Sequence, residues 1–318
     1  MILTLTANPS LDRTAVLPTP LSRGAVHRLE SVSMQAAGKG VNISRAAVAA
    51  GVATLAVLPA LEQDPYVAEL VAHGIPVRPV LPAGNVRINL SITEPDGTTT
   101  KLNSPGDTVG PDDLRRLADV LLEQAAACTA DDWVVLAGSV PPGTPADWYA
   151  DLVGELRATP PRVAVDTSDA PLRALVDGLP GSAPHLIKPN GEELATVTGS
   201  TRRVDSDPVA AAEVARELVA SGIERVLVTL GGHGAVLVDA EGAWHAFAPP
   251  VDVVSTVGAG DSSLFGYLLG HDRDLPPEGR LALAVAYGRA AVTLHGTTIP
   301  DPSHVDADVV EVRALSHA

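Results

Sequence analysis

The sequence predicts an α/β fold in which one doubly wound, mainly parallel sheet carries a small β-sheet lid. Two observations lead to this prediction. Short apolar segments that are typical of buried strands alternate with helical segments along most of the chain, which is the βαβ order of a parallel sheet. Segments with strand periodicity interrupt that order at 11–34 and 85–104, so we expect them to form the lid. No linker divides the chain, which indicates one domain, 1–318.

The expected elements follow from local patterns. Asp64 before Pro65 is a typical helix start, and Gly51 is a typical helix end. In the first half we expect helices at 41–50 and from Pro65 onward, and strands at 2–7, 12–16, 26–34, 53–58, 77–81, 86–93 and 98–103. In the second half we expect helices at 112–126, 146–156, 171–179, 209–220, 262–269, 281–294 and 306–315, with a further helix after the segment 188–194, and strands at 133–137, 163–166, 185–188, 225–230, 236–238 and 253–257.

The segment 86–103 has the pattern of an antiparallel hairpin. Its first strand alternates with period two and meets the turn Glu94-Pro95-Asp96-Gly97, after which the chain returns through 98–103. With the turn centred there, Ser91 and Lys101 face each other across the two strands.

Composition limits the classes of partner. The net charge of −16 and a pI near 4.8 argue against nucleic acid and against an anionic membrane. The single cysteine, Cys128, can form no internal disulfide, which fits a reducing compartment. The first residues lack a basic leader, and no run approaches the ~18 apolar residues of a membrane helix. We therefore expect a soluble, cytoplasmic protein.

The turn at 258–261 can be interpreted in two ways. β-branched residues lead into Gly258-Ala259-Gly260-Asp261, and a helix follows. The bare N–H groups at a helix start favour an anion. Asp261 is then either a helix cap or a general base that deprotonates a hydroxyl while the N–H groups hold a transferring phosphate. This motif alone leaves both interpretations open.

Polar residues near the first strand carry similar alternatives. Asp12 follows this strand at the edge where open α/β sheets bind ligands, or it only caps a turn. Lys39 stands between Gly38 and Gly40 without the Ser or Thr of a Walker A loop, so it is either a loop charge or a ligand-binding cation. Asn42, one step into the following helix, adds weight to a polar site.

Six motifs together resemble the ribokinase-type (PfkB) carbohydrate kinases, most closely their 1-phosphofructokinase and tagatose-6-phosphate kinase branch. They follow family order and spacing over nearly the whole chain. The motifs are Asn8-Pro9-Ser10-Leu11-Asp12, Ala37-Gly38-Lys39-Gly40-Val41-Asn42, Arg87-Ile88-Asn89, Lys188-Pro189-Asn190-x-x-Glu193-Leu194, Leu230-Gly231-x-x-Gly234-Ala235 and Ser255-Thr256-Val257-Gly258-Ala259-Gly260-Asp261-Ser262. The resemblance implies a ribokinase-like fold and transfer of phosphate from ATP, with Mg²⁺, to a sugar phosphate.

The resemblance also implies roles for single residues. Asp261 would be the base, and the N–H groups of Gly258, Ala259 and Gly260 would stabilise charge on the phosphoryl group. The expected sugar-phosphate ligands are Asp12, Gly38, Lys39, Asn42 and Arg87, with Lys101 and Asn103 added as our hypothesis. The expected nucleotide-binding residues are Lys188, Asn190, Thr229, Gly231, Gly234, Ala286 and Arg289, and the expected metal-binding residues, acting through water, are Asn190 and Glu193.

These roles predict conversion of D-fructose 1-phosphate to the 1,6-bisphosphate by direct in-line transfer. Tagatose 6-phosphate, an unphosphorylated sugar and a nucleoside are alternative acceptors, and GTP is an alternative donor. A sugar-phosphate-binding protein without catalysis is the alternative class. Relatives often pair their lid sheets, which implies a homodimer formed through the lid.

The chain departs from its nearest relatives at three positions. Those proteins usually carry Lys where Ser91 stands and an acidic residue where Lys101 stands. We hypothesise that Lys101 supplies the missing charge from the opposite strand, and the alternative is an edge-strand charge that discourages aggregation. Phe265 stands where the family prefers a small residue, and we expect it to narrow the space behind the phosphate loop.

Overall fold

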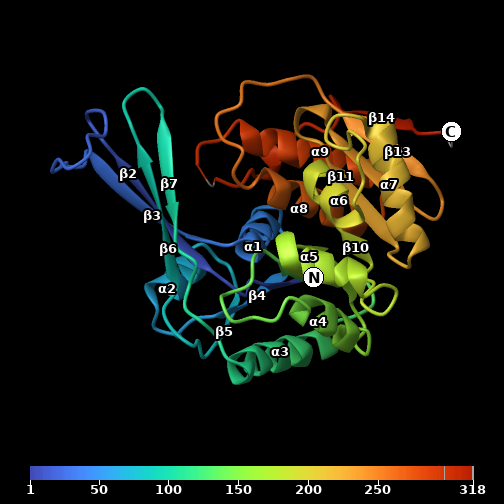
Figure 1. Cartoon of the computed structure of the whole chain (residues 1–318), viewed down its shortest axis with the longest axis horizontal. Coiled ribbons are helices and arrows are strands. Elements are labelled where there is room, and N and C mark those ends of the chain that lie inside the picture. The colour runs from blue at the N-terminus through green and yellow to red at the C-terminus, as the bar shows by residue number, and fades with distance from the viewer. Residues whose placement is uncertain (297, 317–318) are drawn as a thin grey trace.

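The structure, a computed structural model, describes residues 1–296 and 298–316. In this part of the chain, ten strands form a large sheet, and a four-stranded sheet stands off one end of it (Figure 1). The order of the large sheet is β14-β13-β12-β11-β10-β9-β8-β1-β4-β5, and its neighbours from β11 to β5 run parallel. The predicted fold class is therefore confirmed.

The strands of the large sheet match most of the predicted apolar segments. Their bounds are β1 (Ile2–Leu5), β4 (Thr54–Pro59), β5 (Val77–Val80), β8 (Trp133–Ala137), β9 (Arg162–Asp166), β10 (Leu186–Ile187), β11 (Arg225–Thr229), β12 (Ala235–Asp239), β13 (Ala243–Phe247) and β14 (Glu311–Ala314). All four residues of β1 are buried, because this strand has helices on both faces and strands on both sides.

Helices cover both faces of the large sheet. One face packs against α3 (Pro111–Ala126), α4 (Trp148–Leu156), α5 (Asp169–Asp177), α6 (Gly191–Thr198) and α7 (Pro208–Ala220). The other face packs against α1 (Lys39–Ala49), α8 (Ala259–Asp272) and α9 (Pro277–Val292). The remaining helices are α2 (Pro65–Ala72), η1 (Gly231–His233) and η2 (Pro302–His304). Among the described residues, no helix has both the length and the apolar character needed to cross a bilayer.

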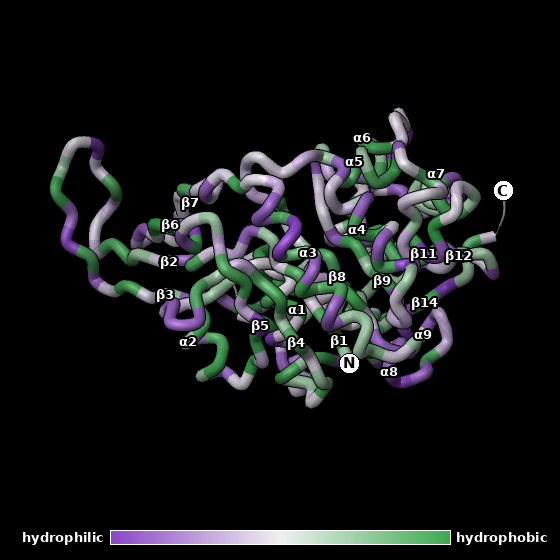
Figure 2. The backbone as a smooth tube through the Cα atoms, turned by 90° about the horizontal axis from the view of Figure 1, so that it is seen from below, coloured by the Kyte–Doolittle hydropathy of each residue, from purple (hydrophilic) through white to green (hydrophobic). Residues whose placement is uncertain are grey.

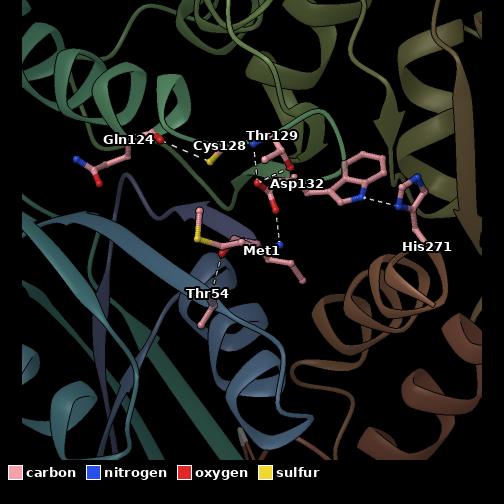
Figure 3. Close-up of polar contacts among 9 residues, drawn as sticks. Met1, Thr54, Gln124, Cys128, Thr129, Asp132 and His271 are labelled. Carbon is pink, nitrogen blue, oxygen red and sulfur yellow. Dashed lines mark hydrogen bonds and ion pairs between the residues drawn. The ribbon is translucent and has the colours of Figure 1, made fainter. Parts of the chain in front are cut away.

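The strand order places one edge of the sheet in a position to bind a ligand. From β1 the chain continues to β4 and β5 on one side, and later to β8 and β9 on the other. The carboxyl ends of the parallel strands therefore border a crevice at this reversal, which is the usual ligand site of a doubly wound sheet. The opposite edge contains Asp132, which accepts from Thr129, and Trp133, which donates to His271 (Figure 3).

The small sheet is built from two insertions into the main domain. Its order is β3-β2-β6-β7, with bounds β2 (Ser10–Val16), β3 (Ser31–Ala37), β6 (Arg87–Thr93) and β7 (Thr99–Asn103). Figure 2 shows these strands at one end of the molecule, away from β11 and β12. Ser91 lies opposite Lys101, so the predicted hairpin register is confirmed.

Alternation gives the small sheet one polar face and one apolar face. Asp12, Asn89 and Asn103 lie in one row across neighbouring strands, and Ser91 and Lys101 lie in the next row of the same face. The other face carries large apolar side chains, of which Val32, Met34, Ile88 and Leu102 are exposed. Much of the apolar face of the small sheet is therefore not covered by other described parts of the same chain.

Two predicted elements are wrong. The expected strand at 253–257 is irregular, because Val254 and Ser255 donate their N–H groups to Val292 O at the end of α9 instead of joining the sheet. The expected helix at 306–315 contains β14, the antiparallel edge strand beside β13. Val312 packs under α9 while Leu315 packs on the opposite side of the sheet, so the apolar residues here do not share a helix face.

Two further differences concern strands. The sequence analysis did not predict β13, although it pairs with β12 over four residues. The second lid strand begins at Ser31 and not at residue 26, and Val26 is almost fully exposed with no partner strand.

Candidate active site

Five ionic or amide side chains meet at the carboxyl edge of the large sheet. They come from four elements that the strand order brings together: α1, the end of β9, the segment after β10, and α8. The residues are Lys39, Asn42, Asp166, Lys188 and Asp261. All of them except Asp166 were predicted from the sequence to be site residues.

Asp261 lies in the first turn of α8 and is 6% exposed. The amide Nδ2 of Asn42 donates to its Oδ2 atom at 2.8 Å. Burial, and after it the charge of Asp166, raises the pKa of Asp261 to about 6. A carboxyl group with this pKa is ionised at neutral pH and is basic enough to accept a proton from a reacting hydroxyl.

The turn before Asp261 has the shape that an anion site requires. Gly258 adopts φ 77°, which is the left-handed region that favours glycine, and the turn leads directly into the N-terminus of α8. Lys188 Nζ lies beside Gly260, 3.2 Å from the position that a Cβ atom would occupy there. Backbone N–H groups of this turn and an ammonium group therefore lie close together, although the N–H of Ala259 already donates to Thr256 O at 3.4 Å.

Asp166 is the functional candidate that the sequence analysis missed. It is 1% exposed and lies between two lysines, with Oδ1 3.0 Å from Lys39 Nζ and Oδ2 3.4 Å from Lys188 Nζ. Burial alone would raise the pKa of Asp166, but the two lysines hold it below its usual value. The sequence feature that could have identified Asp166 is its position as the last residue of a predicted strand, β9, at the same sheet edge as Lys188.

Lys39 is the first residue of α1 and is not a free loop charge. Its pKa is raised, chiefly by Asp166. The flanking glycines have a packing reason, since a Cβ atom on Gly40 would lie 2.5 Å from Thr6 Oγ1 and 2.9 Å from Leu5 O. The glycines thus let the start of α1 approach β1 closely, and this approach brings Lys39 to the end of β9.

The polar face of the small sheet carries a second group. Asp12 Oδ1 accepts from Ser10 Oγ at 2.9 Å and from Asn89 Nδ2 at 3.0 Å. Asn89 Oδ1 is buried and has no partner among the described residues. Asn103 lies opposite Asn89 in the register. Asn89 belongs to a predicted motif but had received no role.

The two remaining cations of this region differ in burial. Arg87 is partly buried, and its guanidinium donates to Asn8 O at 3.3 Å and to Ser104 O at 2.9 Å. Burial lowers its pKa, and a cavity of ≈ 40 Å³ lies beside it. Lys101 is exposed and makes no ion pair with any described residue. Each cation therefore keeps capacity to bind a phosphate.

The predicted nucleotide-binding residues fall into two groups. Asn190 and Glu193 form a capping box at α6, in which each side chain accepts the backbone N–H of the other at 2.8 Å. Thr229 lies beside Asn190, and its N–H donates to Pro189 O. The helical turn that follows β11 contains Gly231 and ends at Gly234.

The second group lies on α9 and in the core. Ala286 is buried, at 2% exposure, whereas Arg289 Nε donates to Pro249 O at 3.1 Å near the surface.

Phe265, which departs from the family pattern, is fully buried between α8 and α9, where its ring meets the ring of Tyr287 edge to face at 5.2 Å. The structure therefore gives Phe265 a packing role.

A carboxylate beside bare amides and lysines, at the reversal point of a doubly wound sheet, defines a phosphotransferase that acts on an alcohol group. The sequence pattern described as pfkB family carbohydrate kinase matches residues 6–304. The chain belongs to this family.

Named relatives agree with the family assignment. The chain is 34% identical to the 1-phosphofructokinase of Escherichia coli K12 over 313 residues, which span 98% of this chain and 97% of the relative. It is 35% identical to the 1-phosphofructokinase of Rhodobacter capsulatus over 309 residues, or 96% of this chain and 95% of that one. Among solved structures, phosphofructokinase-2 from Escherichia coli in complex with substrates and products gives a TM-score of 0.83 at 30% identity and covers 95% of this chain and 96% of its own.

Proposed function

We propose that the protein transfers the γ-phosphoryl group of ATP to D-fructose 1-phosphate and forms fructose 1,6-bisphosphate. The single observation that carries this proposal is Asp261, a buried carboxylate with a pKa of about 6 at the glycine turn of α8. The names of the relatives support the choice of acceptor, because the proteins cited above from Escherichia coli and Rhodobacter capsulatus are 1-phosphofructokinases.

The proposed chemistry is a direct displacement. Asp261 accepts the proton of the acceptor hydroxyl, while the N–H groups of Gly258, Ala259, Gly260 and Asp261 itself hold the oxygens of the moving phosphoryl group. Asn42 orients the base through its 2.8 Å hydrogen bond. The ammonium group of Lys188, next to Gly260, stabilises the negative charge that develops at the same point.

The acceptor is held by groups from both sheets. Asp12, supported by Asn89, accepts hydrogen bonds from sugar hydroxyls. Arg87 and Lys39 bind the phosphate that the sugar already carries, and Gly38 gives the sugar access to the backbone of α1. Lys101 and Asn103 extend this phosphate site from the opposite strand of the hairpin.

The nucleotide occupies the side of the crevice formed by β11, η1 and α9. Thr229, Gly231 and Gly234 border it, and Ala286 and Arg289 lie toward the adenine. Glu193 uses one carboxylate oxygen for the capping box and keeps the other, which suits a water-mediated Mg²⁺ ligand together with Asn190. Bound Mg²⁺ would neutralise charge on the phosphates. No cluster of three or more His, Cys, Asp or Glu side chains among the described residues forms a ready-made metal cage, which agrees with a metal held largely by water and phosphate.

We also propose that the small sheet, with segments 11–34 and 85–104, acts as a lid and pairs with the lid of a second copy. Its polar face supplies acceptor ligands, and its opposite face exposes Val32, Met34, Ile88 and Leu102. Burying this face against a second copy would remove the apolar area from water. A Leu102→Asp variant should be monomeric by light scattering, and an unchanged dimer would contradict this arrangement.

We also propose a cytoplasmic location for the protein, because its single cysteine is free and buried.

One enzyme assay tests the proposed acceptor. Nucleotide consumption is measured with fructose 1-phosphate, tagatose 6-phosphate, free fructose and adenosine at equal concentration, and kcat/KM should be highest for fructose 1-phosphate. Asp261→Asn should reduce kcat by roughly 10²-fold or more while fructose 1-phosphate still binds. Binding of fructose 1-phosphate without turnover by the unaltered protein would instead establish the sugar-phosphate-binding alternative.

A further inference from the structure

A group of arginines lies at the amino edge of the large sheet, opposite the candidate active site. Arg162 is the first residue of β9 and Arg225 is the first residue of β11. Two residues further along these strands, Ala164 and Leu227 both lie in the core beneath α8 and α9. Strand alternation therefore directs Arg162 and Arg225 to the same face, toward the last turn of α8 and the first turn of α9.

Arg162 has no partner within the described part of the chain. Its side chain makes no hydrogen bond and no ion pair there, and its Nη1 atom is buried. An arginine side chain stays charged inside proteins, so it cannot avoid the cost of burial by losing a proton. A half-buried guanidinium without a carboxylate is unusual, and it is more so in a chain with 38 acidic and 22 basic residues.

The neighbouring arginines add donors to this region. Arg280, in the first turn of α9, uses Nε to bond Leu275 O at 2.6 Å and makes no ion pair with any described residue. Within the described residues, the one ion pair of Arg225 is with Glu224, the residue before it, at 3.1 Å. Asp239, which lies opposite Arg225 on β12, accepts the N–H groups of its own turn.

His271 and Tyr267, on the last turns of α8, complete the group. His271 Nδ1 accepts from Trp133 Nε1 at 3.3 Å, a bond drawn to His271 in Figure 3, so its ring proton is on Nε2. Burial, followed by Arg162, Arg280 and Arg225, lowers the pKa of His271 to about 4, while Asp274 acts in the opposite direction. Tyr267 is a buried hydroxyl near Arg225 and Arg280. The group therefore offers many donors, and although Glu224, Asp239 and Asp274 lie nearby, none of these carboxylates forms an ion pair with Arg162 or Arg280 among the described residues.

We propose that Arg162, Arg225, Arg280 and His271, which we call the basal cluster, bind an oxyanion of the phosphate class. The ligand would be inorganic phosphate or the phosphate group of a small metabolite, held by guanidinium N–H groups and by His271 Nε2. An anion would give Arg162 the partner that it lacks among the described residues.

This site is distinct from the active site, and two rigid elements join the two. Arg162 begins β9 and Asp166 ends it, which separates them by roughly 13 Å at ~3.3 Å per residue. Asp261 stands in the first turn of α8 and His271 in its last. An anion at the basal cluster thus contacts the far ends of the two elements that carry Asp166 and Asp261.

The test follows the imidazole of His271 by NMR in the full-length protein. Its signal is assigned from its loss in His271→Asn, and inorganic phosphate is then added at constant ionic strength near pH 7. We expect a saturable shift of the His271 signal in the unaltered protein. The apparent affinity should fall by roughly tenfold or more in Arg162→Gln, because a charged hydrogen-bonding partner is lost. Arg78→Gln, an exposed arginine on β5, is the matched control and should behave like the unaltered protein.

Three arms make the result decisive. A second titration uses fructose 1-phosphate in place of inorganic phosphate. The compound that shifts the His271 signal with the higher apparent affinity is identified as the ligand of the basal cluster. Chloride at the same ionic strength should leave the signal unmoved. Arg280→Gln repeats the loss if Arg162→Gln proves poorly folded by circular dichroism. The proposal is overturned if phosphate leaves the His271 signal unchanged, if chloride moves it equally, or if both arginine variants bind as the unaltered protein does. None of these readouts depends on kinase activity.

Discussion

The pKa of Asp261 predicts the acid limb of the pH profile. Burial and Asp166 raise this pKa to about 6, and the proposed base works only when ionised. The ionised fraction is about one half at pH 6 and about one eleventh at pH 5, so kcat/KM at pH 5 should be roughly tenfold below its plateau. Above about pH 7 the carboxylate is almost fully ionised, and this group imposes no further change.

Two substitutions should move this limb in opposite directions. Asp166→Asn removes a negative neighbour and leaves Lys39 and Lys188 without their counter-ion, and both changes favour the ionised form of Asp261. The pKa should therefore fall, and the limb should move to lower pH. Asn42→Ala removes a hydrogen bond to the ionised carboxylate, so the pKa should rise and the limb should move to higher pH.

The assay is kcat/KM for fructose 1-phosphate from about pH 5 to pH 8 in one buffer of constant ionic strength, for the unaltered protein and both variants. This quantity reports the free enzyme, so the comparison is with the pKa of unliganded Asp261. Both variants are expected to lose part of their plateau rate, and the position of the limb is the informative measurement. A limb that stays in place in both variants, or that moves the same way in both, would refute the assignment of this titration to Asp261.

Three further predictions concern the phosphate site and the packing around it. Lys101→Ala should raise the KM for fructose 1-phosphate several-fold with little change in kcat, and an unchanged KM rejects a phosphate-binding role for this lysine. Gly40→Ala should cost roughly 1–3 kcal/mol of folding free energy, because its Cβ atom would meet Thr6 and Leu5, whereas Gly154→Ala, with open space around it, should be neutral or stabilising by thermal denaturation. Phe265→Ala should cost roughly 3–5 kcal/mol, and a melting temperature within error of the unaltered protein would contradict its role in the core.

Much of the architecture could be predicted because local patterns agree with the global fold. Buried runs such as 133–137 and 163–166 lie on parallel strands, and the Pro95-Asp96-Gly97 turn set the register that pairs Ser91 with Lys101. The misassigned segments are those in which tertiary context overrides propensity. Among the described residues, the β-branched run at 253–257 pairs with no strand, and the segment 306–315 contains the edge strand β14, whose partner β13 was itself unpredicted.

The site was predicted less completely for a different reason. Motifs identified Asp261, Asn42, Lys39 and Lys188, since each stands beside a glycine turn or a distinctive spacing. Asp166 has no such neighbourhood, and its importance appears only when β8, β9 and β10 are placed side by side. The bond from Asn42 to Asp261 joins residues 219 positions apart and could not be read from spacing.

Four chain segments connect the small sheet to the main domain, because β2–β3 and β6–β7 form two separate excursions that are joined by the parallel pairing of β2 with β6. A small sheet joined to the main domain by one linker could rotate freely. With four connections, this sheet can only change its tilt. Any tilt must also be shared with β1, which runs into β2 after four residues, and with α1, which starts two residues after β3. If the small sheet acts as the lid proposed above, we expect its movement on acceptor binding to be transmitted to α1, whose Asn42 donates to Asp261, so that acceptor binding and orientation of the base are coupled.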